Sequence, residues 1–252
     1  MKKNRLYIST IAPDARLLAV QYGLGLELAE CCTAADMDDH WAQTRPLIEA
    51  DLAAASRRIF HGPFNELYPS AIDPKAVQLA RERLEQAFSL SLSLGVKTMV
   101  VHSGHVPMLY FDSWFVERSV LFWKDFLKDK PAGSRICMEN VLEEDPKALI
   151  AVVKQVDDPR FCLCLDVGHA NAVSPLPVMD WVQYCAPFVG HFHLHNNDGT
   201  WDHHRSLENG SIPMESLLRQ IDQLCPDVTF TIETAEARSS LHWLEETDLL
   251  EE

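Results

Sequence analysis

The sequence of 252 residues lacks several features that would assign it to a large class of proteins. It has no run of about 20 apolar residues, so we expect no membrane helix. Its N-terminal apolar run is too short for a secretory signal peptide. It contains no GxGxxG or GxxxxGK[ST] phosphate loop, which argues against the common nucleotide-binding folds. No Gly/Ser-rich linker or low-complexity tract divides the chain, which predicts a single domain over residues 1–252.

Positive charge and paired cysteines are also scarce. Lys and Arg number 22 against 37 Asp and Glu, which gives a formal net charge of −15. A nucleic-acid-binding protein normally presents a basic face, so this balance argues against a nucleic-acid partner. The seven cysteines form no CxxC pair and are odd in number, which is typical of reduced thiols in the cytosol. We therefore expect a cytoplasmic protein, and its composition is compatible with a homo-oligomer.

Eight short apolar segments alternate with eight amphipathic, helix-like segments. The apolar segments are rich in β-branched, aromatic and leucine residues, as buried parallel strands are. A helix is expected from Asp73 to Leu94, ending before Gly95, and another is expected to begin at Pro146. This alternation predicts an α/β fold, a single (β/α)8 TIM barrel, with a doubly wound open sheet as the alternative. The predicted strands occupy residues 5–10, 23–30, 57–64, 97–104, 135–141, 161–169, 190–197 and 229–235.

Metal-capable side chains stand at the ends of six consecutive predicted strands. Functional residues of a TIM barrel lie at the C-terminal ends of its strands, so these side chains are expected to meet at one rim. A single histidine at a strand end is usually a hydrogen-bonded structural residue, but six such positions in register indicate a metal-dependent site. In chain order they are His61, His102, Glu139, Asp166, His193 and Glu233, with His169 just beyond the sixth strand.

The segment HFHLHNNDGTWDHH, residues 191–204, holds five histidines and two aspartates. Its first three histidines alternate with apolar residues, so they share the strand face that points into the barrel. We expect His193 to be a metal ligand and the deeper His191 to be a hydrogen-bonded core residue, whereas His195 stands at the strand end, in contact with the metal or one shell further out. Asp202 and His204 follow in a loop that either folds back over the site or is solvated.

Several motifs together resemble the xylose isomerase-like barrels, a superfamily of sugar isomerases, ketose 3-epimerases, dehydratases and endonuclease IV-type nucleases. Each motif alone is weakly specific, but the set is specific and covers most of the chain from His61 to Glu233. The motifs are HGPF, VVHSG, MEN, CLDVGHAN, GHFHLH, the DHHRSLENG loop and TIET.

The isomerase and epimerase branch implies one divalent metal, Mn, Mg, Co or Zn, and a small sugar or sugar-phosphate substrate. A site of three carboxylates and one imidazole suits such cations, which polarise a carbonyl and a neighbouring hydroxyl. Two glutamates would be the catalytic groups and move a proton through a metal-stabilised enediolate. The implied metal ligands are Glu139, Asp166, His193 and Glu233, the catalytic pair is Glu139 and Glu233, and the expected substrate-binding residues are His61, His102, His169, Trp201 and His204.

The nuclease branch implies three zinc ions and cleavage of abasic DNA. Two local departures and the acidic composition favour the sugar enzyme: LHNND stands where the nucleases have HLND, and LENG stands where they have LGEG. A third interpretation, an inactive barrel that serves as a binding subunit, leaves the two glutamates unexplained. The residues that match the three-zinc pattern are His61, His102, Glu139, Asp166, His169, His193, Asp202, His204 and Glu233.

Overall fold

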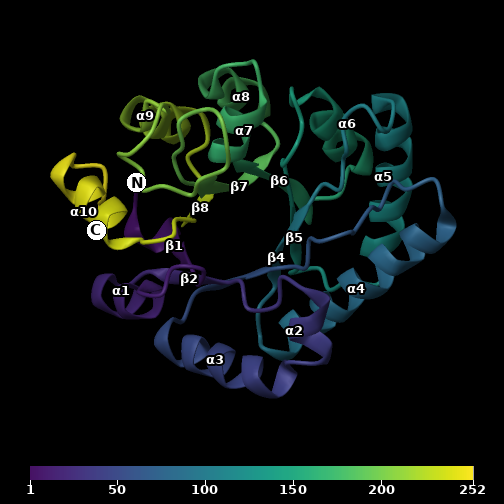
Figure 1. Ribbon diagram of the computed structural model, residues 1–252, viewed down its shortest axis with the longest axis horizontal. Coiled ribbons are helices and arrows are strands. Elements are labelled where there is room, and N and C mark those ends of the chain that lie inside the picture. The colour runs from purple at the N-terminus through teal and green to yellow at the C-terminus, as the bar shows by residue number, and fades with distance from the viewer. Residues whose placement is uncertain (252) are drawn as a thin grey trace.

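Eight parallel strands form a closed barrel in the computed structural model, which describes residues 1–251. Each strand pairs with the next, and β8 pairs with β1 to close the ring. Figure 1 shows the barrel with its helices around the outside. The predicted TIM barrel is therefore confirmed. The strands are β1 (Leu6–Ser9), β2 (Gly25–Leu28), β3 (Arg58–His61), β4 (Thr98–His102), β5 (Arg135–Glu139), β6 (Phe161–Asp166), β7 (Val189–Leu194) and β8 (Thr229–Ile232).

Ten α-helices cover the barrel within residues 1–251, which corrects the expectation of eight. The difference arises because two connections, those after β2 and β6, each contain two helices. Pro175 and Pro177 separate the pair after β6, since proline cannot continue a helix. The helices are α1 (Ala15–Tyr22), α2 (Ala34–Asp38), α3 (Trp41–Ala54), α4 (Pro74–Ser93), α5 (Asp112–Leu127), α6 (Lys147–Val156), α7 (Val167–Val173), α8 (Val178–Cys185), α9 (Met214–Leu224) and α10 (Arg238–Glu246), and a short 3-10 helix, η1, covers Lys3–Arg5.

The ends of the chain lie side by side at the edge of the barrel. Lys2 forms an isolated parallel bridge with Glu251, and Figure 1 places both ends near α10.

Two predicted helix boundaries are close to those observed. Gly95 follows α4 with a φ of +73°, as a helix-terminating glycine does, and α6 begins at Lys147, one residue after Pro146. None of the helices within residues 1–251 is both long and apolar enough to cross a membrane.

The barrel interior changes from apolar to polar along its axis. A small apolar cluster of Ile59, Val100, Cys137 and Cys164 fills one layer between the strands. The main apolar core lies elsewhere, in the shell where strands and helices pack together. The inward-facing residues beyond the small cluster are largely histidines and carboxylates, so the metal-capable side chains occupy the polar end of the barrel.

Helix α7 begins without a loop, directly after β6. The side chain of Asp166 caps it by accepting a hydrogen bond from the backbone N–H of His169 at 2.6 Å. The helix passes so close to β7 that a Cβ at Gly168 would overlap the imidazole of His195. Glycine at this position therefore lets the His195 ring lie against the first turn of α7.

We predict that Gly168→Ala destabilises the protein by about 1–3 kcal/mol, because the new methyl group forces His195 to move in a packed interior. Equilibrium unfolding in urea measures this loss. Gly133→Ala is the matched control, because its added Cβ would meet no heavy atom closer than 3.9 Å, and it should change stability by less than about 0.5 kcal/mol. Equal stabilities for the two variants would show that the His195 ring moves aside without cost.

Candidate metal centre

Four side chains from the ends of four adjacent strands converge on one point. Glu139 ends β5, Asp166 ends β6, His193 lies in β7 and Glu233 follows β8. One ligand atom from each lies within 4.8 Å of the others. Nδ1 of His193 is 3.0 Å from Oε2 of Glu233, 3.3 Å from Oε1 of Glu139 and 3.7 Å from Oδ2 of Asp166. We call this group the quartet. All four side chains are buried.

The quartet contains several buried polar atoms without a hydrogen-bond partner among residues 1–251. They are both carboxylate oxygens of Glu139, Oδ2 of Asp166 and Nδ1 of His193. Leaving such atoms unpaired is costly, and the cost is greatest for charged groups. A cation at the centre of the quartet would engage all of these residues at once. The donor set of three carboxylates and one imidazole therefore fits a divalent metal.

The electrostatics of the quartet also favour a cation. Burial acts to raise the pKa of Glu139, but the charge on His193 and the hydrogen bonds from His169 and His193 outweigh it and hold this pKa well below its usual range. Burial acts to lower the pKa of His193, whereas Cys164 and the carboxylates of Glu233, Glu27 and Glu139 raise it well above its usual value. Since the carboxylates are ionised, the site is a concentration of buried negative charge, and such a site attracts a cation.

Glu27, a residue that sequence reasoning missed, holds His193 from the other side. Its Oε1 lies 2.9 Å from Nε2 of His193, and its Oε2 lies 3.2 Å from Nε2 of His191. The imidazole of His193 therefore donates through Nε2 and presents Nδ1 to the quartet, an arrangement in which a carboxylate orients a metal-ligating histidine. The signal was present in the sequence, because Glu27 is the one charged residue of an otherwise apolar strand, β2.

Two further residues give the site its shape. Asn140 was not predicted, and its side chain bonds both the backbone N–H and the carbonyl of Asp166, at 2.8 and 2.9 Å, which fixes the end of β6. His191 is fully buried and contacts Thr229 Oγ1 at 2.7 Å and Thr231 Oγ1 at 2.9 Å. The prediction of a hydrogen-bonded core residue is confirmed for His191.

A second group shares Glu139 with the quartet. Oε2 of Glu139 lies 3.5 Å from Nε2 of His61 and 3.6 Å from Nε2 of His102, while Oε1 faces the quartet. The ligand atoms of these three residues also lie within 4.8 Å of one another. Burial lowers the pKa of His102 to about 4, so its imidazole is neutral and has a lone pair available for a metal. The two oxygens of one carboxylate thus face two different candidate metal positions.

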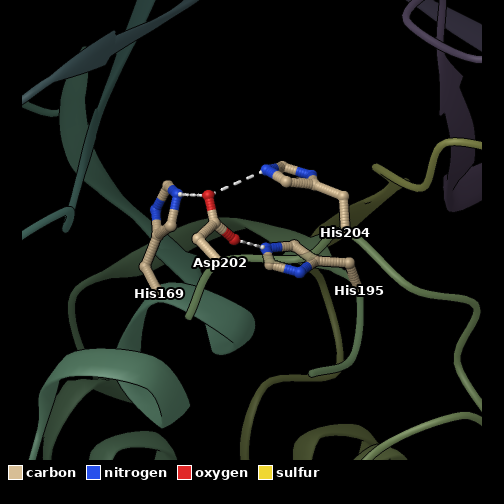
Figure 2. A group of neighbouring side chains, drawn as sticks. All are labelled: His169, His195, Asp202 and His204. Atoms are coloured by element: carbon tan, nitrogen blue, oxygen red, sulfur yellow. Dashed lines mark hydrogen bonds and ion pairs between the residues drawn. The ribbon is translucent and has the colours of Figure 1, made fainter. Parts of the chain in front are cut away.

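A third group combines His169 of α7 with His195, Asp202 and His204 from the loop that follows β7. Figure 2 shows the carboxylate of Asp202 between three imidazoles. Its Oδ2 lies 3.2 Å from Nε2 of His169 and 3.0 Å from Nε2 of His204, and its Oδ1 lies 3.5 Å from Nε2 of His195. This loop folds back over the barrel, one of the two alternatives that the sequence left open. His195 also reaches Oδ1 of Asp166 at 3.1 Å and so connects this group to the quartet.

Trp201 lies apart from the three groups. Its side chain is 71% exposed and lines a pocket together with His169 and Asp202. The structure thus brings the other sequence-predicted site residues, Asp202 included, together around one rim and places Trp201 at the edge of that rim.

The rim around these groups has very little positive charge. Seven loops lead from a strand to the next helix, and β6 runs directly into α7. The only Lys or Arg in these loops is Arg205, which pairs with Asp198 at 2.8 Å. The same loops carry acidic residues such as Glu66, Glu144 and Glu208. A phosphate or polyphosphate at this rim would find no unpaired side-chain cation in the loops.

The chain is similar to several known proteins. The uncharacterised protein MJ1311 of Methanocaldococcus jannaschii is 25% identical over 193 residues, which is 73% of this chain and 66% of that protein, just under two thirds of its length. The TTHB071 protein from Thermus thermophilus, solved after soaking with ZnCl2, has a TM-score of 0.75 at 26% identity over 97% of both chains. A D-tagatose 3-epimerase-like protein has a TM-score of 0.79 at 20% identity, again over 97% of both, and shows the shared fold.

A family model described as xylose isomerase-like TIM barrel matches residues 22–250. The match spans nearly all of the closed barrel and includes every residue of the three groups. The resemblance in the sequence motifs is therefore confirmed, and the chain belongs to the xylose isomerase-like TIM barrel family.

Proposed function

We propose that this protein is a metal-dependent sugar isomerase or epimerase. The observation that carries the proposal is the convergence of Glu139 and Glu233, from β5 and β8, on Nδ1 of His193. Two carboxylates beside one candidate metal position can provide the base, in the ionised form, and the acid, in the protonated form, that a proton transfer at carbon requires. A bound divalent metal would polarise the carbonyl and a neighbouring hydroxyl of the sugar, which acidifies the C–H bond between them.

In this proposal different residues bind the metal, transfer the proton and bind the sugar. Glu139, Asp166, His193 and Glu233 hold the metal, and Glu27 keeps Nδ1 of His193 aimed at it. One glutamate, when ionised, removes the proton from the substrate carbon and thereby becomes an acid. It then returns that proton to the adjacent carbon, or the other glutamate, when protonated, delivers a proton to the opposite face of the same carbon. His61, His102, His169 and His204 surround this point and would hydrogen-bond the sugar hydroxyls, while Trp201 would contact an apolar face of the substrate.

A sugar fits the surroundings better than DNA does. A nucleic acid is held mainly by Lys and Arg contacts to its phosphates. The loops around the centre offer only Arg205, and this side chain is already paired with Asp198. The proposed substrate is therefore a small neutral molecule, and we place the protein in the isomerase and epimerase branch.

A zinc-dependent phosphodiesterase that acts on abasic DNA is the second candidate, and one observation favours it. Both oxygens of Glu139 face histidine nitrogens of different groups, as a carboxylate that bridges two metals would. The group of Asp202, His169, His195 and His204 supplies a third cluster of donor atoms. Metal clusters of this kind suit phosphodiester hydrolysis, in which the attacking and the leaving oxygen both need a cation.

The first prediction concerns the quartet. His193→Ala should weaken binding of Mn²⁺ or Zn²⁺ at least about tenfold, because it removes the one nitrogen that faces all three carboxylates. Elemental analysis after dialysis measures metal content, and circular dichroism checks that the barrel is folded. His242→Ala, a surface histidine on α10 with a 68% exposed side chain, is the control and should retain full metal content. Unchanged metal in the His193 variant would remove this residue from the ligand set.

The second prediction concerns the catalytic pair. Glu139→Gln and Glu233→Gln should each lower turnover by roughly 10²- to 10⁴-fold, since an amide cannot act as a base. Manganese-loaded protein is incubated in D₂O with D-fructose, D-tagatose or D-allulose, and deuterium at the carbon next to the carbonyl is measured by NMR. Glu236→Gln, an exposed acid in the loop after β8, is the control. Turnover without deuterium uptake would indicate a hydride shift or a shielded relay and would leave the glutamates as ligands only.

The third prediction separates the two candidate functions. We expect about one tightly held metal per chain, with weaker additional binding that His61→Ala/His102→Ala removes. Zinc titration with elemental analysis counts the ions, and an oligonucleotide with one abasic site tests for nicking. About three tightly held zinc ions together with nicking would reverse the ranking and establish the phosphodiesterase.

A further inference from the structure

We infer that the substrate carries an uncharged apolar or aromatic portion and that this portion binds in a pocket beside the metal centre. The inference rests on the proposed function, because it assigns a second part to the same substrate. The pocket, here called the side pocket, has a volume of about 410 Å³. Its walls include Val141, Leu142, His169, Val173, Trp201 and Asp202. A volume of this size is within the range of pockets that bind small organic ligands.

The side pocket lies next to the metal centre, and the imidazole of His169 belongs to the walls of both. His169 lines the pocket and presents Nδ1 to Oε1 of Glu139 at 3.2 Å. Its Nε2 lies 3.2 Å from Asp202, a second residue of the pocket wall. A molecule with its reacting carbons at the quartet would therefore pass His169 and extend into the side pocket. Because His169 contacts both the quartet and the pocket, we expect a substituent attached directly to a short sugar to reach the pocket past this ring.

The walls of the side pocket are apolar and unusually accessible. Trp201 is 71% exposed and Leu142 is 45% exposed, so both present apolar surface to solvent. The polar side chains of the wall already have partners: Asp202 is held by His169 and His204, and Thr200 donates a hydrogen bond to Asp198 at 2.5 Å. Covering this apolar surface with an apolar group is favourable, at roughly 25 cal/mol per Å² removed from water.

Charge excludes the main alternative, a substrate with a phosphate at this end. No Lys or Arg is among the residues that line the side pocket, and its one acidic side chain is Asp202. A phosphate here would lose its hydration and meet the carboxylate of Asp202, while the one imidazole in the wall, His169, is already paired with Asp202 and Glu139. The class of substrate that fits is therefore a sugar or hydroxy-ketone with an uncharged aryl or alkyl substituent, and not a sugar phosphate.

The test uses three hydroxamates, which share a head that chelates a divalent metal and differ in their tails. Acetohydroxamate has a methyl tail, phenylacetohydroxamate has an aromatic tail and phosphoglycolohydroxamate has a charged one. Isothermal titration of the manganese-loaded protein measures each affinity. We expect phenylacetohydroxamate to bind at least about tenfold more tightly than acetohydroxamate, because the phenyl ring buries apolar area in the side pocket. Phosphoglycolohydroxamate should bind no more tightly than acetohydroxamate.

Two variants test whether the aromatic tail binds in the side pocket. In Trp201→Ala the ratio of the phenylacetohydroxamate and acetohydroxamate affinities should fall to about 1. In Phe111→Ala, which removes an 85% exposed aromatic side chain from the loop before α5, outside the side pocket, the ratio should be unchanged. A ratio near 1 in the wild-type protein, tightest binding of the phosphate-bearing probe, or an equal loss in both variants would overturn the inference while leaving the metal centre intact.

A failure of the proposed function gives a different result. If acetohydroxamate shows no manganese-dependent binding, the metal centre is wrong, and the side pocket is then tested with 2-phenylethanol, which has no chelating head. Saturation-transfer NMR should detect 2-phenylethanol on the wild-type protein and on Phe111→Ala but not on Trp201→Ala. Absence of that signal on the wild-type protein would overturn the inference independently of the metal.

Discussion

The structure of the centre depends on the fixed orientation of one imidazole, that of His193. It is fully buried, and carboxylates face both of its nitrogens: Glu27 at Nε2, and Glu139, Asp166 and Glu233 at Nδ1. A buried group of several ionised carboxylates is stable only when cations or hydrogen bonds compensate it. His193 provides that compensation for Glu27 through a close contact, but it leaves the other three carboxylates incompletely paired. This imbalance makes the quartet a candidate site for a divalent metal.

The number of bound metals determines what the two carboxylate oxygens of Glu139 can do in catalysis. If a single cation sits in the quartet, Oε2 of Glu139 remains free among the imidazoles of His61 and His102 and can exchange a proton with a substrate. If a second cation binds His61 and His102, the same oxygen becomes a ligand and loses its basic character. The carboxylate of Glu139 therefore cannot act as a full base while it also bridges two metal ions. Metal stoichiometry is for this reason a direct measure of mechanism.

The charge of the rim complements the charge of the centre. Loops with one paired arginine and many acids discourage anionic substrates, whereas a buried cation attracts neutral molecules that can offer two oxygens. The side pocket adds an apolar surface next to this polar centre. The candidate metal ligands, the acidic rim and the apolar pocket together restrict the proposed substrate more narrowly than the family fold does, because one fold is shared by many activities.

Much of this arrangement was readable from the sequence for a geometric reason. Parallel strands in a barrel all end at one rim, so a strand pattern that ends in a metal-capable residue already places that residue near its counterparts. His61, His102, Glu139, Asp166, His193 and Glu233 were found in this way. The same alternation of strands and helices predicted the barrel, and the alternation within β7 placed His191 in the core.

Tertiary structure decided what depends on contacts between distant segments. Glu27 meets His193 across 166 residues, and no local pattern in β2 announces its partner. Asp202 and His204 lie over the barrel because of the path of a long loop. The spacing of these residues in the sequence allowed either a loop folded over the site or a solvated loop. The paired helices after β2 and β6, and the side pocket between Leu142, Val173 and Trp201, arise from packing of loops and helices. The sequence by itself determined which residues reach the rim, because strand register is periodic, whereas only the packed chain determined which atoms of those residues face one another.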